Sequence, residues 1–128
     1  MSDYAIVNLK ELEDSAAGQA AGIEARFARK HLASEHIGVT YMRYEAGVRS
    51  PMAHSHREQE EVYIVTRGAG KARLDDEIRD IRQWDAVRVS PATIRAFEAR
   101  LEGIEFLAIG SQRPDGGDGI QAPTAWVE

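Results

Sequence analysis

Residues 54–65 read HSHREQEEVYIV, and this stretch decides both the fold class and the candidate site. Side chains two positions apart on an extended strand point to the same face, so His54 and His56 project together. The residues after Glu61 are β-branched and aromatic and predict a second strand. A turn over residues 57–60 would bring Glu61 back towards the histidines. Two imidazoles and one carboxylate suit a divalent transition metal (Mn, Fe, Ni, Cu or Zn), with positions left open for water or substrate.

The composition excludes several classes of function. A chain of 128 residues is expected to form one domain and to bury a core. Because cysteine is absent, disulfides, thiolate zinc sites and cysteine nucleophiles are excluded, and a metal must bind to nitrogen and oxygen. A net charge of −5 argues against nucleic acid or an anionic membrane as a partner. Neither a long apolar run nor a signal peptide is visible, so we expect a cytoplasmic protein.

Strand signals follow one another closely through most of the chain. Short runs of β-branched and aromatic residues alternate with Gly, Pro or Asp turns. Many short strands with such turns predict an antiparallel all-β sandwich or barrel. The expected strands cover 37–44, 62–66, 71–74, 78–81, 84–89, 94–99 and 104–109, and the expected turns include 67–70, 75–77 and 90–93.

The two ends of the chain are less regular. Residues 4–9 predict a short strand, and residues 10–22 a loop or an irregular helical turn. The segment 110–119 is rich in Gly and Asp and predicts a loop. The apolar residues Trp126 and Val127 indicate that the C-terminal tail docks back onto the body.

Five residues resemble the first sequence motif of the cupin family. The spacing of Gly47, His54, His56, Glu61 and Gly68 is close to that motif, with one extra residue between Gly47 and His54. The resemblance implies that the two histidines and the glutamate are metal ligands.

The second cupin motif is matched only in outline. Trp84-Asp85 stands where that motif has Gly-Asp, and Ser90-Pro91-Ala92 stands at its proline turn. Arg95 falls where the family has a fourth ligand histidine, and Ala99 where it has an asparagine. The resemblance covers roughly residues 37–110.

The resemblance implies a small antiparallel jelly-roll (double-stranded β-helix) barrel with the site in its mouth. Residues 1–128 would form a single domain, with an N-terminal strand and irregular arm (1–22), the barrel (23–110) and a docking tail (111–128). Where the barrel begins, helix propensity favours a helix, but cupins commonly run a strand there, so we expect a strand over 23–31. Cupins often dimerise through edge strands or swapped N-termini, so a homodimer is also implied.

Arg95 leaves three arrangements open. A guanidinium stays charged and cannot serve as a normal metal ligand. In the first arrangement, the three ligands of the first motif bind a metal and Arg95 receives an anionic group of the substrate. In the second, Arg95 pairs with Glu61, and this ion pair takes the place of the metal. In the third, His31 or His36 supplies the missing imidazole.

Two classes of function follow. As an enzyme, the protein would be a metal-dependent cupin acting on a small organic anion that Arg95 orients. Tyr63 shares the face of Glu61 and is a second candidate catalytic residue, although such a tyrosine more often packs in a core. Isomerase-, dioxygenase- and decarboxylase-like chemistries all occur on this fold, which does not choose among them. As a binding module, the barrel would hold a small anion or sugar without metal or turnover.

Overall fold

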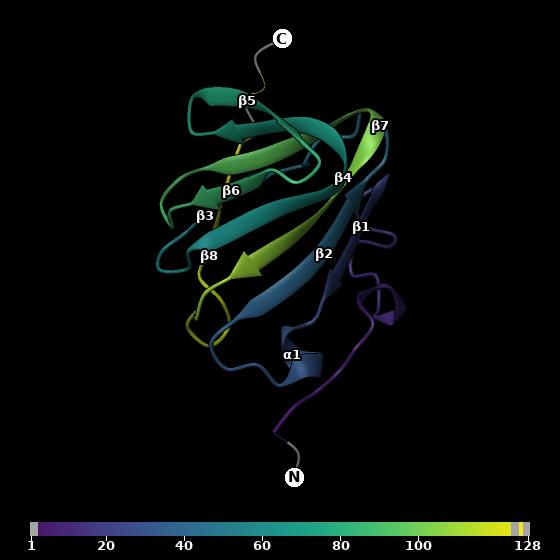
Figure 1. Ribbon diagram of the computed structural model, residues 1–128. Helices are drawn as coiled ribbons and strands as arrows, with labels where there is room; N and C mark the ends of the chain where they lie inside the picture. Colours follow the sequence, from purple (N-terminus) through teal and green to yellow (C-terminus); the bar gives the residue numbers. More distant parts are fainter. Residues whose placement is uncertain (1–2, 124–125, 127–128) are drawn as a thin grey trace.

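Antiparallel strands make up about half of the structure, a computed structural model that describes residues 3–123 and 126 (Figure 1). None of the helices among these residues is long and apolar enough to cross a membrane. Every strand pair is antiparallel, and the sheet curls on itself, so the expected all-β jelly-roll architecture is confirmed. In chain order the elements are η1 (Leu9–Glu11), β1 (Ile23–Phe27), α1 (Arg29–Leu32), β2 (Gly38–Tyr44), β3 (Ala53–His56), β4 (Glu61–Leu74), β5 (Glu77–Arg82), β6 (Ala86–Val89), β7 (Arg95–Gly110) and β8 (Gly119–Ala122).

The two longest strands, β4 and β7, close the sheet. The second half of β7 lies between β2 and β4, so that Leu107 pairs with Tyr41 on one side and Ile64 on the other. The first half of β7 pairs with the end of β4, and Arg95 at its start pairs with His54 on β3. The curl therefore places Arg95 directly beside the strand that carries the histidines.

Two glycines allow β4 and β7 to cross closely. A Cβ atom at Gly68 would overlap the carbonyl oxygen of Gly103, and one at Gly70 would overlap the carbonyl oxygen of Glu98. The register between the two strands shifts at these positions, which marks bulges. The turn expected at 67–70 is therefore wrong, because β4 continues through it. Likewise, β7 passes through Gly103, whose φ is +76°, without ending there.

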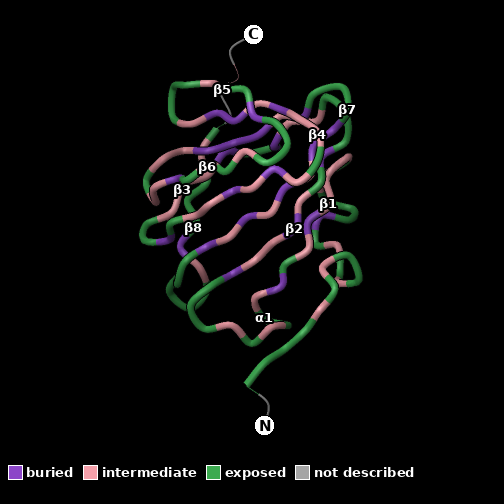
Figure 2. The backbone as a smooth tube through the Cα atoms, in the orientation of Figure 1, coloured by how far each residue is buried: buried purple, intermediate pink, exposed green. Residues whose placement is uncertain are grey.

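Aromatic rings fill the barrel beneath the site. The ring centroids of Tyr63 and Phe97 are 4.7 Å apart, and those of Phe97 and Phe106 are 4.9 Å apart. Tyr44 packs on Phe106 at 5.6 Å. Such ring pairs contribute about 0.5–1.5 kcal/mol each beyond the burial of their surface. Buried residues recur along the strands that carry these rings, interspersed with residues of intermediate burial (Figure 2).

The N-terminal segments differ from expectation. Residues 4–9 form no strand, and the side chain of Asn8 accepts a hydrogen bond from the backbone N–H of Lys10 at the start of η1. This local cap competes with an extended conformation. The strand expected over 23–31 ends at Phe27, and the short helix α1 follows. The strand implied by the family resemblance is therefore confirmed for 23–27, and the helix favoured by propensity forms only after it.

The C-terminal tail contributes a strand that the sequence did not predict. β8 pairs with β3 along its whole length, so that Gly119 lies opposite His56. Trp126 lies against the guanidinium of Arg49, with 5.5 Å between Cζ and the ring centroid. Val127 lies outside the described residues.

Trp84 adopts a conformation that normally belongs to glycine. Its φ is +73°, in the left-handed region, at the position where the cupin motif has Gly. The expected strand 84–89 consequently begins two residues later, at Ala86. The indole is 70% exposed, so burial provides little compensation for this backbone strain.

Candidate metal centre

The structure brings His54, His56 and Glu61 together. Both histidines lie on β3, and the turn over 57–60 returns the chain so that β4 begins at Glu61. The Nε2 atoms of His56 and His54 lie 3.2 and 3.7 Å from Oε1 of Glu61. One ligand atom from each of the three residues lies within 4.8 Å of the others. The spacing in the sequence therefore translates into one cluster of three potential ligands.

The three residues fit a divalent metal. Two ligand atoms about 2.1 Å from a shared ion and about 90–110° apart lie about 3.0–3.4 Å from each other. The nitrogen–oxygen distances of 3.2 and 3.7 Å are close to this range. Nε2 of His56 is buried and has no hydrogen-bond partner of normal geometry within the described chain. A buried nitrogen of this kind is expected where a metal supplies the missing partner.

Asp118 is the site residue that the sequence reasoning missed. One carboxylate oxygen lies 2.8 Å from Nδ1 of His56, and the other accepts hydrogen bonds from the backbone N–H groups of Glu58 and Gln59 at 2.7 and 2.9 Å. Burial would raise the pKa of Asp118, but these contacts outweigh it and lower the pKa to about 2. The ionised carboxylate can only accept, so Nδ1 of His56 carries the proton and Nε2 faces Glu61.

Glu61 is held as a carboxylate. Burial alone would raise its pKa. Contacts with His54, His56 and Tyr63, together with the charge of Arg95, outweigh burial and hold the pKa well below its ordinary value. The Tyr63 hydroxyl donates to Oε1 at 2.6 Å, and burial, followed by the charge of Glu61, raises the pKa of Tyr63 well above 10.0. Tyr63 is therefore a neutral donor at the site.

His56 is the basic imidazole of the site. Contact with Glu61 raises its pKa, burial acts in the opposite direction, and Asp118 raises it further. Its side chain is only 12% exposed, whereas that of His54 is 39% exposed. The two rings meet edge to face, with centroids 5.0 Å apart. His54 is thus the potential ligand on the more exposed side of the cluster.

Arg95 lies fully buried beside the cluster. Its Nη1 donates to the carbonyl oxygens of Pro91 and Thr93 at 3.1 and 2.7 Å. Its Nη2 lies 3.2 Å from Oε1 of Glu61 and makes no hydrogen bond of normal geometry among the described residues. This ion pair is the contact expected in the second of the three arrangements.

His31 and His36 lie outside the cluster. His36 is exposed, and its ring nitrogens face Gln112 at 3.4 Å and Glu35 at 3.6 Å. His31 lies on α1 and is also exposed. Neither joins the group of potential ligands among the described residues. The third arrangement, with a fourth imidazole, is therefore wrong for this conformation.

The cluster opens into a cavity of about 1110 Å³. This volume lies slightly above the range typical of pockets that hold small molecules, about 300–1,000 Å³. Phe97, Phe106, Met42 and Ala108 supply apolar wall, and the polar side chains converge at the cluster and at the mouth. The cavity therefore admits an organic molecule with a carbon skeleton and polar ends.

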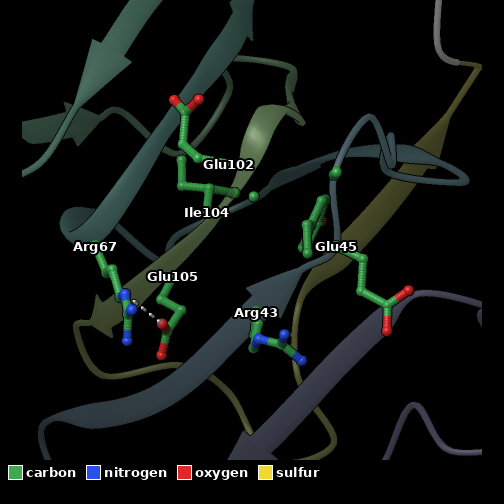
Figure 3. Close-up of a pocket in the computed structure, with 9 residues that line it drawn as sticks. Arg43, Glu45, Arg67, Glu102, Ile104 and Glu105 are labelled. Atoms are coloured by element: carbon green, nitrogen blue, oxygen red, sulfur yellow. Dashed lines mark ion pairs between the residues drawn. The ribbon is translucent and has the colours of Figure 1, made fainter.

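A smaller cleft of about 260 Å³ lies where β7 bends at Gly103 (Figure 3). Glu105 on β7 faces Arg67 on β4, with 3.9 Å between the carboxylate oxygen and Nε. Charges of both signs compensate one another there, and none of its described lining residues is a histidine. The other charged residues of this cleft are Arg43, Glu45 and Glu102.

Comparison with known proteins shows which solved structures share this fold. No protein-family model matches the chain, and no curated protein matches it. A cupin protein from Bacteroides fragilis superposes with a TM-score of 0.74 at 22% identity, covering 100% of this chain and 99% of that chain. KdgF from Halomonas sp. superposes with a TM-score of 0.64 at 18% identity, covering 90% of each chain. Oxalate decarboxylase from Bacillus subtilis gives a TM-score of 0.77 at 19% identity, covering 94% of this chain and 33% of its own.

These similarities agree with the residues of the first motif and with the curled antiparallel sheet. Identities of this size establish architecture and carry no substrate with them. The chain therefore has the fold of a small single-domain cupin.

Proposed function

We propose that this protein is a cupin that binds a divalent transition metal through His54, His56 and Glu61 and holds a small organic anion beside that metal. The observation that carries the proposal is the cluster itself. Three ligand atoms of suitable chemistry lie within 4.8 Å of one another, and a buried imidazole nitrogen among them lacks a hydrogen-bond partner within the described chain. Two nitrogens and one oxygen suit Mn, Fe, Ni, Cu or Zn.

The surrounding residues support specific roles. Asp118 orients His56, and Tyr63 donates to Glu61, so both ligands are fixed before a metal arrives. When bound, the metal would supply Lewis-acid or oxygen-binding chemistry at its open positions. Arg95 would orient a carboxylate of the ligand, a role supported by its Nη2 lying 3.2 Å from the Glu61 oxygen that the histidines also face. Oxalate decarboxylase, which resembles this chain in fold, is named for a carboxylate substrate.

A metal-free binding function is the second candidate. The ion pair between Arg95 and Glu61 favours it, because the guanidinium already compensates the buried carboxylate. In that case the barrel would hold a small anion or sugar without turnover. The two candidates differ in one measurable property, the metal content of the protein.

The test is elemental analysis of protein purified without a histidine tag, before and after reloading with each metal. We expect close to one equivalent of metal in the wild type and loss of most of it in the double variant His54→Gln/His56→Gln. His36→Gln is the matched control, because His36 is exposed and outside the cluster. Less than about a tenth of an equivalent in the reloaded wild type would exclude the metal proposal and leave the binding module.

The homodimer implied by the family resemblance stays a prediction. Among the strands of the described chain, β1 pairs only with β2. Its other edge is partly covered by the N-terminal segment, because Ala25 accepts a hydrogen bond from the backbone N–H of Ser15 at 2.8 Å and donates one to Asp14 at 3.0 Å. Light scattering over a range of concentrations measures the mass directly. A monomer mass at every concentration would contradict the prediction.

A further inference from the structure

The charge of the cavity lining differs from that of the whole molecule. The chain has a net charge of −5. Its cavity nevertheless gathers the permanently cationic Arg29, Lys30, Arg95 and Arg113, against the carboxylates Glu13 and Glu61. Because Glu61 is engaged by Arg95 and the histidines, the excess of positive charge lies on Arg29, Lys30 and Arg113. These residues are the more exposed part of the lining, here termed the mouth of the cavity. A concave surface of one sign concentrates ligands of the opposite sign.

Arg29 is held at this mouth without a carboxylate partner among the described residues. It begins α1, and its side chain lies across the backbone of Gly38, where an added Cβ would come within 2.8 Å of Nε. Nη2 donates to the carbonyl oxygen of Ser111 at 3.0 Å, and Gln59 donates to the same oxygen at 2.9 Å. The guanidinium is therefore fixed in direction while most of its donors stay unused.

Arg113 approaches the same place from the C-terminal tail. It lies two residues after Ser111, and its guanidinium packs over Gly117, where an added Cβ would lie 2.8 Å from Nη1. Burial and then the charge of Arg113 lower the pKa of Arg29, so the two cations are close enough to repel each other. In the part of the chain that the structure describes, no carboxylate offsets this repulsion at either guanidinium. Two unpaired guanidinium groups in one cavity wall suit an anionic group of a ligand.

We propose that Arg29 and Arg113 form an anion subsite at the cavity mouth, and that the ligand is an elongated organic anion held at both ends. One end would meet Arg29 and Arg113, the carbon skeleton would lie against Phe106 and its neighbours, and the other end would meet the metal and Arg95. The group at the mouth is a carboxylate or a phosphate. This inference rests on the proposed function for its inner end only.

The test compares matched pairs of ligands by isothermal titration calorimetry at low salt. Adipate and hexanoate share a carbon skeleton and differ in the second carboxylate. In the same way, 3-phosphoglycerate and glycerate differ in the phosphate. We expect the member with two anionic groups in at least one pair to bind about tenfold more tightly in the wild type, and the pair with the larger ratio identifies the anion. Succinate and glutarate then report the preferred length.

The double variant Arg29→Gln/Arg113→Gln should abolish this difference and leave binding of the singly charged member unchanged. Arg67→Gln is the matched control, because that arginine belongs to the separate cleft of Figure 3 and should keep the wild-type ratio. Thermal unfolding of each variant shows whether the fold is retained, and the single variants Arg29→Gln and Arg113→Gln serve if the double variant unfolds. A wild type that does not distinguish the members of either pair overturns the subsite. So does a ratio that survives both substitutions.

Metal analysis of the same samples separates the two proposals. If the protein takes up no metal but still prefers the ligand with two anionic groups through Arg29 and Arg113, the subsite stands and the metal function fails. If metal binds and the ligand pairs are not distinguished, the metal function stands and the subsite fails.

Discussion

Replacement of Asp118 by alanine should weaken both the fold and the metal site. The side chain is 1% exposed and accepts hydrogen bonds from His56 and from the backbone N–H groups of Glu58 and Gln59. Asp118→Ala leaves these donors without an acceptor in the turn that joins β3 to β4. An unsatisfied buried donor costs about 1–3 kcal/mol, and water can reach the exposed Glu58, so we expect a total loss of about 2–4 kcal/mol.

The pH dependence gives a second measure of the same contribution. Folding lowers the pKa of Asp118 from 3.8 to about 2, and one pKa unit corresponds to about 1.4 kcal/mol, so ionisation stabilises the native state by about 2 kcal/mol. Because the folded pKa is the lower one, this stabilisation is complete above about pH 4 and is lost as the pH falls towards about 2. The difference in unfolding free energy between wild type and Asp118→Ala should therefore shrink over that interval.

Metal affinity should fall as well, because His56 loses the group that fixes its proton on Nδ1. Loss of such a partner typically weakens metal binding about 10–100-fold. Urea denaturation at several pH values and competition with a chromophoric chelator measure the two effects. Asp115→Ala is the matched control, because Asp115 is exposed in the same loop, and it should change stability by less than about 0.5 kcal/mol. If Asp118→Ala matched this control in both stability and metal affinity, the role assigned to Asp118 would be refuted.

Three further outcomes are expected. Trp84→Gly should raise the unfolding free energy by about 1 kcal/mol, because φ at this position is +73° and the indole is 70% exposed; an unchanged or lower value in urea would contradict this. Gly70→Ala should lower the unfolding free energy by more than about 2 kcal/mol, because the new Cβ would overlap the carbonyl oxygen of Glu98. Gly116→Ala has open space around it and should cost about 1 kcal/mol from its φ alone. Equal losses in the two variants would count against steric overlap at Gly70. Metal affinity should be weaker at about pH 6 than at about pH 8, because the raised pKa of His56 lets a proton compete for Nε2; the same affinity at both pH values in a chelator titration would show that His56 is not a ligand.

The sequence could predict the ligand cluster because its geometry is local. His54, His56 and Glu61 lie on two strands joined by one short turn, so alternation along a strand and the reversal of the chain are sufficient to bring them together. Asp118 lies 62 residues after His56 in the sequence, and only the pairing of β8 with β3 brings the two side chains together. β8 is short and largely exposed, so it carries no hydrophobic alternation by which it could be found.

The sequence was sufficient to predict the fold class, but it was less reliable on where each strand begins and ends. Strand signals were read correctly along most of the barrel, but glycine has two meanings in such a pattern. At Gly68 and Gly70 it allows one strand to cross another closely, and at a turn it supplies a backbone conformation. A glycine between apolar or polar neighbours reads the same way in the sequence in both cases. The difference lies in Gly103 and Glu98 on β7, more than twenty residues away, which a pattern restricted to neighbours does not contain.

Arg95 shows why charge alone could not choose between the first two arrangements. Pro91 and Thr93 hold one nitrogen of the guanidinium through their carbonyl oxygens, so the turn before β7 fixes its position whether or not a metal is present. Only Nη2 reaches Glu61. If the proposed function holds, the same side chain would compensate the buried carboxylate when no metal is bound and receive an anionic ligand group when the metal takes over that compensation. The two arrangements would then be two states of one site, and the metal content of the protein would decide which of them is populated.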